Sequence, residues 1–312
     1  AALKLAGRKG GRTVRKALAL LRTGSKGPEV SYAKRMINLA SARRKHGFRW
    51  QNEFDAENQT FTALFHKAVA AFQQAAGFKG QDVDGVIGDK TWGALGVQLA
   101  ITYPIRLVPQ PKRHTCFECC ARMIQNGRAA KLGKTRLVAV ERGSERMVEI
   151  RPDGSRVPTD RFAEPEILKL FAKGGLWMGE GLHAVDEHNL KLFARRNAWQ
   201  WHWPPASFEQ IAEWLGQGPV MAGGFLVNPG QEAYPGHAVA IGGIWTDWTE
   251  EGTLLKIFDP FPVGRGRIYA TQPDRFFASG RPFQVEIFYV PADAGTKTLG
   301  SYQIWEDNIP KY

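Results

Sequence analysis

Gln110-Pro-Lys-Arg-His-Thr-Cys-Phe-Glu-Cys-Cys-Ala-Arg-Met123 is the stretch from which the fold and chemistry of this chain are best predicted. Thr115 and Glu118 have the Thr-x-x-Glu spacing of a capping box ahead of an apolar run, so a helix is predicted to begin at Cys116. A thiol at this position lies beside unpaired backbone N–H groups and the positive end of the helix dipole, which favour the thiolate. Cys116 is therefore a candidate nucleophile.

Gln110 precedes Cys116 by six residues and lies in a proline-flanked loop. From there its side-chain amide can reach back beside the thiol and donate a hydrogen bond to an oxyanion. Such a donor is typically worth about 100- to 1000-fold in rate. Gln110 is therefore a candidate oxyanion donor.

Two later segments supply a candidate base and a group to orient it. Residues 236–245 are predicted to form a buried strand with His237 near its start, and residues 253–259 the next strand, which ends at Asp259. Folding these strands antiparallel about Trp248 sets His237 opposite Asp259, with both side chains on the same face of the sheet. An acid beside a histidine fixes its tautomer and supports the imidazolium.

The order of elements predicts an α+β fold. Before residue 219 the predicted elements are mostly helices, the last of which spans 208–215 and is capped by Ser207. A hairpin is predicted at 137–150. Strands are then predicted at 219–227, 237–245, 253–259, 266–270 and 283–290. Helices followed by an antiparallel sheet are typical of this class.

The ordered set Gln-x5-Cys (110–116), Gly-His-Ala-Val (236–239) and Asp-Pro (259–260) resembles the papain-like cysteine peptidases. It is most similar to the bacterial branch that includes bacteriocin-processing peptidases and secreted effectors. That branch often has Cys-Trp-Ala-Ala-Cys-Ala-x-Met where this chain has Cys-Phe-Glu-Cys-Cys-Ala-Arg-Met, so Glu118 and Cys119 depart from the pattern. The resemblance covers about residues 108–291.

This resemblance implies a nucleophile helix packed on an antiparallel sheet that carries the base. It implies that Cys116 is the nucleophile, that His237 is the general base and then the acid, and that Asp259 orients His237. Gln110 would donate to the oxyanion. No metal or cofactor is implied.

The three cysteines also allow other interpretations. An odd number does not make a disulfide framework, and buried cysteines often act only as small apolar side chains, as we expect for Cys119 and Cys120. Cys116 and Cys119 have redox-pair spacing, but no thioredoxin-like strand and helix surround them. A zinc site using these cysteines and His114 lacks a second pair of ligands at suitable spacing.

Residues 21–100 are predicted to form three helices, the last after a glycine-rich turn. Apolar residues at helical spacing are Val30, Ala33, Ile37 and Ala40 in the first helix, and Phe61, Leu64, Phe65, Ala68, Val69 and Phe72 in the second, which Gly77 ends. Leu-Arg-x-Gly-Ser-Lys-Gly-Pro (21–28), Ala-Val-Ala-Ala-Phe-Gln-Gln (68–74) and Asp-Gly-Val-Ile-Gly-x-Lys-Thr-Trp (84–92) together resemble the three-helix peptidoglycan-binding domain.

That second resemblance implies a groove between the helices. Asp84, Thr91 and Trp92 are its candidate residues, either as ligand contacts or only as its frame. The polar loop at 44–59 is longer than the family pattern and is expected to alter or block the groove.

Positive charge is concentrated at the start of the chain. Residues 1–50 hold 14 Lys and Arg and one acid, Glu29, for a charge of +13, and the total is +12, so the remainder sums to −1. This asymmetry indicates an anionic polymer as partner, and a solvated basic tail is the alternative for residues 1–20. With a wall-binding module beside it, peptidoglycan is the expected partner rather than nucleic acid. The sequence contains no run of 18 apolar residues, so no membrane span is predicted.

The predicted layout is a basic segment (1–20), a peptidoglycan-binding domain (21–100), a linker (101–107), a papain-like cysteine hydrolase (108–291) and a tail (292–312). It predicts a peptidoglycan-targeted endopeptidase or amidase, delivered to the bacterial periplasm or cell wall as a secreted antibacterial effector or lysin, with an immunity protein as a further partner. One alternative is a protease that cuts proteins while the wall module only anchors it. Another is a catalytically dead binding protein, which Glu118 beside the thiol would favour.

Overall fold

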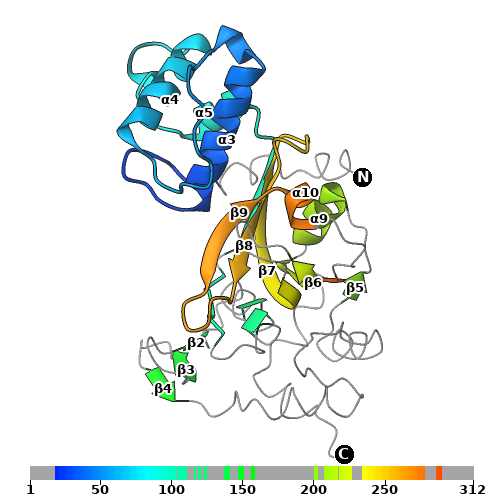
Figure 1. Cartoon of the computed structure of the whole chain (residues 1–312). Helices are drawn as coiled ribbons and strands as arrows, with labels where there is room; N and C mark the ends of the chain where they lie inside the picture. The colour runs from blue at the N-terminus through cyan, green and yellow to red at the C-terminus, as the bar shows by residue number, and fades with distance from the viewer. Residues whose placement is uncertain are drawn as a thin grey trace, which may run out of the picture. The chain divides into compact units, whose positions relative to one another are not determined.

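Helices, two antiparallel sheets and the loops between them make up the described part of the chain in the computed structural model (Figure 1). The described residues are 18–103, 105–110, 116, 119–120, 123–124, 137–140, 147–150, 156–158, 200–202, 207–216, 218–226, 234–277 and 286–289. Contacts divide the chain into two units. The first comprises the chain up to Thr102 with Gly243–Lys256 and Ile268–Pro273, and the second comprises Tyr103–Gly242, Ile257–Arg267 and the chain from Asp274 onward.

Three helices of the first unit surround a common apolar core, namely α3 (Pro28–Ala42), α4 (Ala63–Ala75) and α5 (Asp89–Leu95). Pro28 begins α3, where its fixed φ suits the first turn and its missing N–H is not needed. The predicted inward positions of α3, Val30, Ala33, Ile37 and Ala40, are all buried.

Helix α4 begins at a side-chain cap, because Thr62 Oγ1 accepts a hydrogen bond from Phe65 N at 3.2 Å. Gly77, with φ of 83°, follows its end in the left-handed conformation that glycine adopts most readily. Leu64, which shares the helical spacing of the apolar residues in this segment, is 53% exposed. Leu64 lies in the first turn, at the edge of the stripe that buries Phe65 and the apolar residues after it.

The loop at 44–59 is folded onto α3 and α4. Phe48 and Phe54 are buried and meet Phe72 and Phe65 edge-on, with ring centroids 5.4 and 4.9 Å apart respectively. Asn38 Nδ2 donates to Phe54 O (2.8 Å) and its Oδ1 accepts from Phe54 N (3.0 Å), which fixes the loop backbone on α3. The loop is therefore part of the hydrophobic core of the first unit.

The larger sheet has the strand order β5-β10-β6-β7-β8-β9, and β1 also pairs with β7. Its strands are β1 (Leu99–Thr102), β5 (Gln200–His202), β6 (Val220–Leu226), β7 (Tyr234–Thr246), β8 (Leu254–Asp259), β9 (Arg267–Thr271) and β10 (Glu286–Tyr289). Antiparallel pairing sets Val220 of β6 opposite Ile241 of β7, and Leu99 of β1 opposite Thr246. Helix α9 (Phe208–Leu215) precedes β6, and α10 (Pro273–Phe277) follows β9.

Two further predictions from the sequence, a hairpin and a helix cap, agree with the structure. Strands β2 (Leu137–Val140), β3 (Met147–Ile150) and β4 (Arg156–Pro158) pair antiparallel in that order, so the predicted hairpin at 137–150 is confirmed. The predicted cap of α9 is also confirmed, because Ser207 Oγ accepts from Gln210 N at 3.3 Å.

Other predicted segments are changed or lie beyond what the structure describes. Ile101 and Thr102, at the start of the expected linker, belong to strand β1. Basic-segment residues 1–17 and the tail at 292–312 lie outside the described residues. None of the helices in the described ranges is long and apolar enough to cross a membrane.

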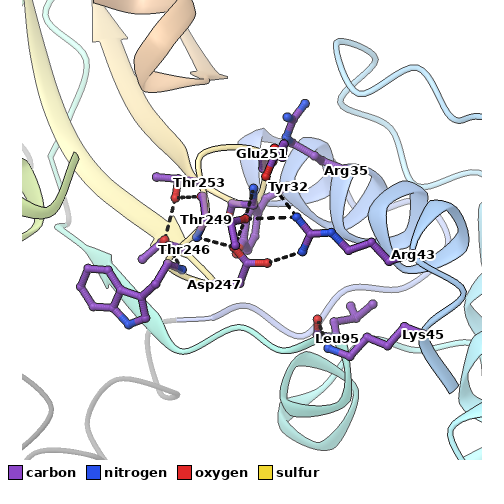
Figure 2. A network of polar contacts seen from close by, with 12 residues as sticks. Tyr32, Arg35, Arg43, Lys45, Leu95, Thr246, Asp247, Thr249, Glu251 and Thr253 are labelled. Atoms are coloured by element: carbon purple, nitrogen blue, oxygen red, sulfur yellow. Dashed lines mark hydrogen bonds and ion pairs between the residues drawn. The ribbon is translucent and has the colours of Figure 1, made fainter. Parts of the chain in front are cut away.

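The turn between β7 and β8 belongs to the first unit, where α3 holds it in place (Figure 2). The ring of Tyr32 stacks with Trp92 and with Trp245, at centroid distances of 5.8 and 5.6 Å. Tyr32 Oη donates to Gly252 O at 3.2 Å. Burial, together with the charge of Asp247, raises the pKa of the Tyr32 hydroxyl well above its usual value, so it remains a neutral donor.

Ionic contacts join the same turn to the end of α3. Arg43 donates to Asp247 Oδ2 (3.2 Å), Thr249 Oγ1 (3.3 Å) and Glu251 Oε2 (3.1 Å), and Figure 2 shows these side chains converging. Within the turn, the hydroxyls of Thr246 and Thr253 are 2.6 Å apart. The turn that leads β7 into β8 is thus fixed by an aromatic stack and by a charged network.

Candidate functional site

The candidate nucleophile lies on the buried face of a helix. The described residues Cys116, Cys119, Cys120, Met123 and Ile124 are all helical and all buried. Their spacing of i, i+3, i+4, i+7 and i+8 is that of one apolar face. The capping residues Thr115 and Glu118 lie outside the described residues.

The three thiols are free but differ in access and surroundings. Cys116 is 7% exposed, whereas Cys119 and Cys120 are fully buried. Cys119 Sγ lies 3.9 Å from Pro109 O, a weak contact in which the thiol donates. Burial, with the charges of the neighbouring thiols and Asp259, raises the pKa of Cys120 well above its usual value, so Cys120 remains a neutral thiol.

His237 and Asp259 form a buried pair. Nε2 of His237, on β7, lies 2.6 Å from Oδ1 of Asp259, at the end of β8. The two side chains are 4% and 0% exposed. Strands β7 and β8 are neighbours joined by the turn at 247–253, and this hairpin brings the histidine and the acid together.

His237 also contacts the candidate nucleophile through a side-chain hydrogen bond with Cys116. Because Nε2 faces Asp259, Nδ1 is the ring nitrogen left for the thiol. Burial by itself lowers the pKa of His237, but the hydrogen bonds to Asp259 and Cys116 and the charges of both outweigh burial and raise it to about 9. At neutral pH the ring is therefore a cation held between two groups that can carry negative charge.

Asp259 accepts hydrogen bonds from three donors. Oδ1 accepts from His237 Nε2 and from Phe261 N (2.9 Å), and Oδ2 accepts from Arg267 Nε at 3.0 Å. The sequence interpretation missed Arg267. The signal that could have revealed this residue is the pair Gly264 and Gly266, which predicts a turn between β8 and β9. That turn brings the start of β9 back beside the end of β8.

Gln110 is buried, and the turn after Asp259 holds its backbone from both sides. Its N–H donates to Pro260 O at 2.9 Å, and its carbonyl accepts from Gly264 N at 2.8 Å. The segment that carries the candidate oxyanion donor is thus anchored on the turn that follows the candidate orienting acid.

In the first unit, Asp84, Thr91 and Trp92 take part in building the fold. Thr91 and Trp92 are buried, and the side chain of Gln73 donates to Asp84 Oδ1 (2.9 Å) and to Thr91 Oγ1 (3.1 Å). Trp92 Nε1 donates to Ala19 O at 3.2 Å. Asp84 and Thr91 are thus joined through Gln73, and Trp92 is tied to the segment before α3.

The arrangement can support nucleophilic chemistry at sulfur. A thiol bonded to an imidazolium, which a buried carboxylate holds in turn, is the arrangement needed for thiolate attack. Within the described ranges, no cluster of three or more His, Cys, Asp or Glu residues is placed to hold a metal ion.

Comparisons of the chain with protein-family models, curated proteins and solved structures gave no match.

Proposed function

We propose that this chain is a cysteine hydrolase that cleaves amide bonds. The observation that supports it most strongly is that one buried imidazole, His237, bonds to Asp259 at 2.6 Å and also to Cys116. Buried charged groups are costly to maintain for stability alone, and such clusters are enriched at functional sites.

In the proposed reaction, the Cys116 thiolate attacks the carbonyl carbon of the scissile amide. A carbon–sulfur bond forms, and the carbonyl electrons move onto oxygen, where Gln110 donates a hydrogen bond. The imidazolium of His237 then protonates the leaving nitrogen as the carbon–nitrogen bond breaks. Water attacks the resulting thioester while His237 takes its proton, which releases the acid product and restores the thiolate.

We propose a peptide of the bacterial cell wall as the substrate. The motifs at 21–28, 68–74 and 84–92 resemble a wall-binding domain, and the charge of +13 in residues 1–50 suits an anionic polymer. A binding module joined to the hydrolase raises its effective concentration at the wall. The proposal includes delivery to the periplasm or cell wall as an antibacterial effector or lysin, and an immunity protein as the partner of an effector.

A protein-cutting protease is the second candidate, and one observation favours it. Thr91 and Trp92 are buried in the core, so a wall ligand does not reach them in this conformation. The loop at 44–59 also adds Phe48 and Phe54 to that core. The first unit would then anchor the chain weakly, and the substrate would be set by the hydrolase site alone.

Mass spectrometry of purified peptidoglycan fragments after incubation with the chain tests these alternatives. The wild type is expected to give defined cleavage products, and Cys116→Ala none. Cys119→Ala, which removes a buried thiol from the same helix, is the matched control and should retain cleavage. Cleavage of an unfolded protein such as casein, with intact wall fragments, would favour the protease. No cleavage of either substrate would contradict the hydrolase proposal.

A further inference from the structure

Arg267 is a charged residue of the thiolate site that the proposed reaction does not yet use. It is the first residue of β9, and its side chain is 29% exposed. Its Nε donates to Oδ2 of Asp259 at 3.0 Å. Asp259 is itself fully buried, so Arg267 brings a permanent positive charge to a carboxylate that water does not reach.

The two oxygens of Asp259 have different donors. Oδ2 accepts from Arg267, and Oδ1 accepts from His237 Nε2 and from Phe261 N. A carboxylate bonded through one oxygen can still turn about its terminal torsion, which is broad for Asp. Donors on both oxygens fix its plane, and charge-assisted bonds are the strongest of this kind.

We propose that Arg267 is a positioning residue of the thiolate site. By holding Oδ2 of Asp259 it keeps Oδ1 on Nε2 of His237, and it thereby keeps the opposite edge of the imidazole toward Cys116. This inference rests on the proposed function, because it assigns Arg267 to the same Cys116–His237 pair.

Arg267 is distinct from the described groups that face His237. Asp259 on β8 bonds to its Nε2, Cys116 on the nucleophile helix bonds to the ring as well, and the ring of Phe261 meets it edge-on at a centroid distance of 6.2 Å. Cys120 is close enough to Asp259 for their charges to interact, but it is buried and remains a neutral thiol. Among these neighbours, Arg267 is the permanent cation that bonds to Asp259.

The rate at which iodoacetamide alkylates Cys116 at pH 7, followed by peptide mass spectrometry, tests this role without any assumption about the substrate. We expect Arg267→Ala to slow alkylation on the order of 10-fold, the lower end of the loss that follows removal of the hydrogen-bond partner of a metal-ligating side chain. On a cleaved substrate, kcat should fall by a similar factor with KM unchanged, because binding groups are intact. Arg265→Ala removes an equal charge from an exposed position of the same turn and should behave as the wild type.

Chemical rescue separates positioning from a general loss of structure. Because Arg267 is partly exposed, millimolar guanidinium chloride is expected to enter the space left in Arg267→Ala and restore much of the alkylation rate. Sodium chloride at the same concentration should restore none. Near-UV circular dichroism reports whether each variant is folded, and Arg267→Gln replaces the alanine variant where that one does not fold.

Three results would overturn the inference. A folded Arg267 variant that alkylates within about twofold of the wild type would show that the arginine does not position the pair. A slow but folded Arg267→Ala that guanidinium does not rescue, or failure of both variants to fold, would assign Arg267 to folding instead. The proposed function fails separately: if Cys116 of the wild type is no more reactive than Cys119 and Cys120, the thiolate itself is absent.

Discussion

The hairpin of β7 and β8 carries charged pairs at each of its two ends, and the two ends differ in burial. Near the open end, Asp259 and His237 are 0% and 4% exposed. At the turn, Arg43 and Glu251 are 43% and 62% exposed. Exposed ion pairs contribute little to stability because water screens them, whereas buried pairs are strongly coupled to their surroundings. We therefore expect changes at the buried end of the hairpin to cost more than changes at its exposed end.

Replacing His237 should have the largest effect of any change to the hairpin. His237→Ala removes both the proton carrier and the cation that supports the thiolate, so we expect turnover to fall by about 10,000-fold or more. Steady-state cleavage assays measure this fall. Asp259→Asn should cost less, because the amide still hydrogen-bonds while losing its charge. Full activity of a folded His237→Ala would contradict the mechanism.

The second largest effect should come from the aromatic stack that holds the turn. Trp245 is fully buried against Tyr32, so Trp245→Ala is expected to lower the free energy of unfolding by about 3–5 kcal/mol. Urea denaturation measures this change. Trp248→Ala removes a half-buried indole from the same turn and is the matched control, with a clearly smaller loss expected. Equal losses would show that the stack does not hold the turn.

The sequence predicts the local pieces of both ends better than their surroundings. Even spacing across a hairpin sets His237 beside Asp259, because strand geometry has a period of two and the turn is short. Helix α3 was predicted from Val30 and the apolar residues that follow it, because its buried stripe repeats at helical spacing. Period and capping are local properties, which is why these pieces were accessible from the sequence alone.

Tertiary contacts were not accessible in the same way. The stack of Tyr32 on Trp245 joins residues far apart in the sequence, and no motif marks either as a partner. Contacts likewise place Gly243–Lys256, which includes the turn that α3 holds, in the unit with α3, although the two segments are far apart in the sequence. The bond from Arg267 to Asp259 depends on how β9 pairs with β8. The glycines between these strands predict a turn but do not specify that pairing.

The pH dependence of stability should report the buried end of the hairpin. The folded pKa of His237 is raised from 6.5 to about 9, so its contribution to stability is fully present below about pH 6.5 and is lost as the pH rises through 9. The melting temperature of the wild type should therefore fall over this window relative to that of His237→Gln. If the melting temperatures of the two proteins change with pH in parallel, the imidazolium is not stabilised by the fold.

The smallest effect is expected at the exposed end. Arg43→Ala removes the contacts to Asp247, Thr249 and Glu251, yet the arginine side chain is 43% exposed, so the loss should be below about 1 kcal/mol. High salt should make this loss of stability smaller still, because salt already screens the ion pair in the wild type. Lys90→Ala is the control, since it breaks a more exposed pair with Asp82 and should cost no more. Denaturation at low and high salt measures both variants. A loss above about 2 kcal/mol for Arg43→Ala would show that Asp247, whose side chain is only 10% exposed, depends on this partner much as Asp259 depends on its own.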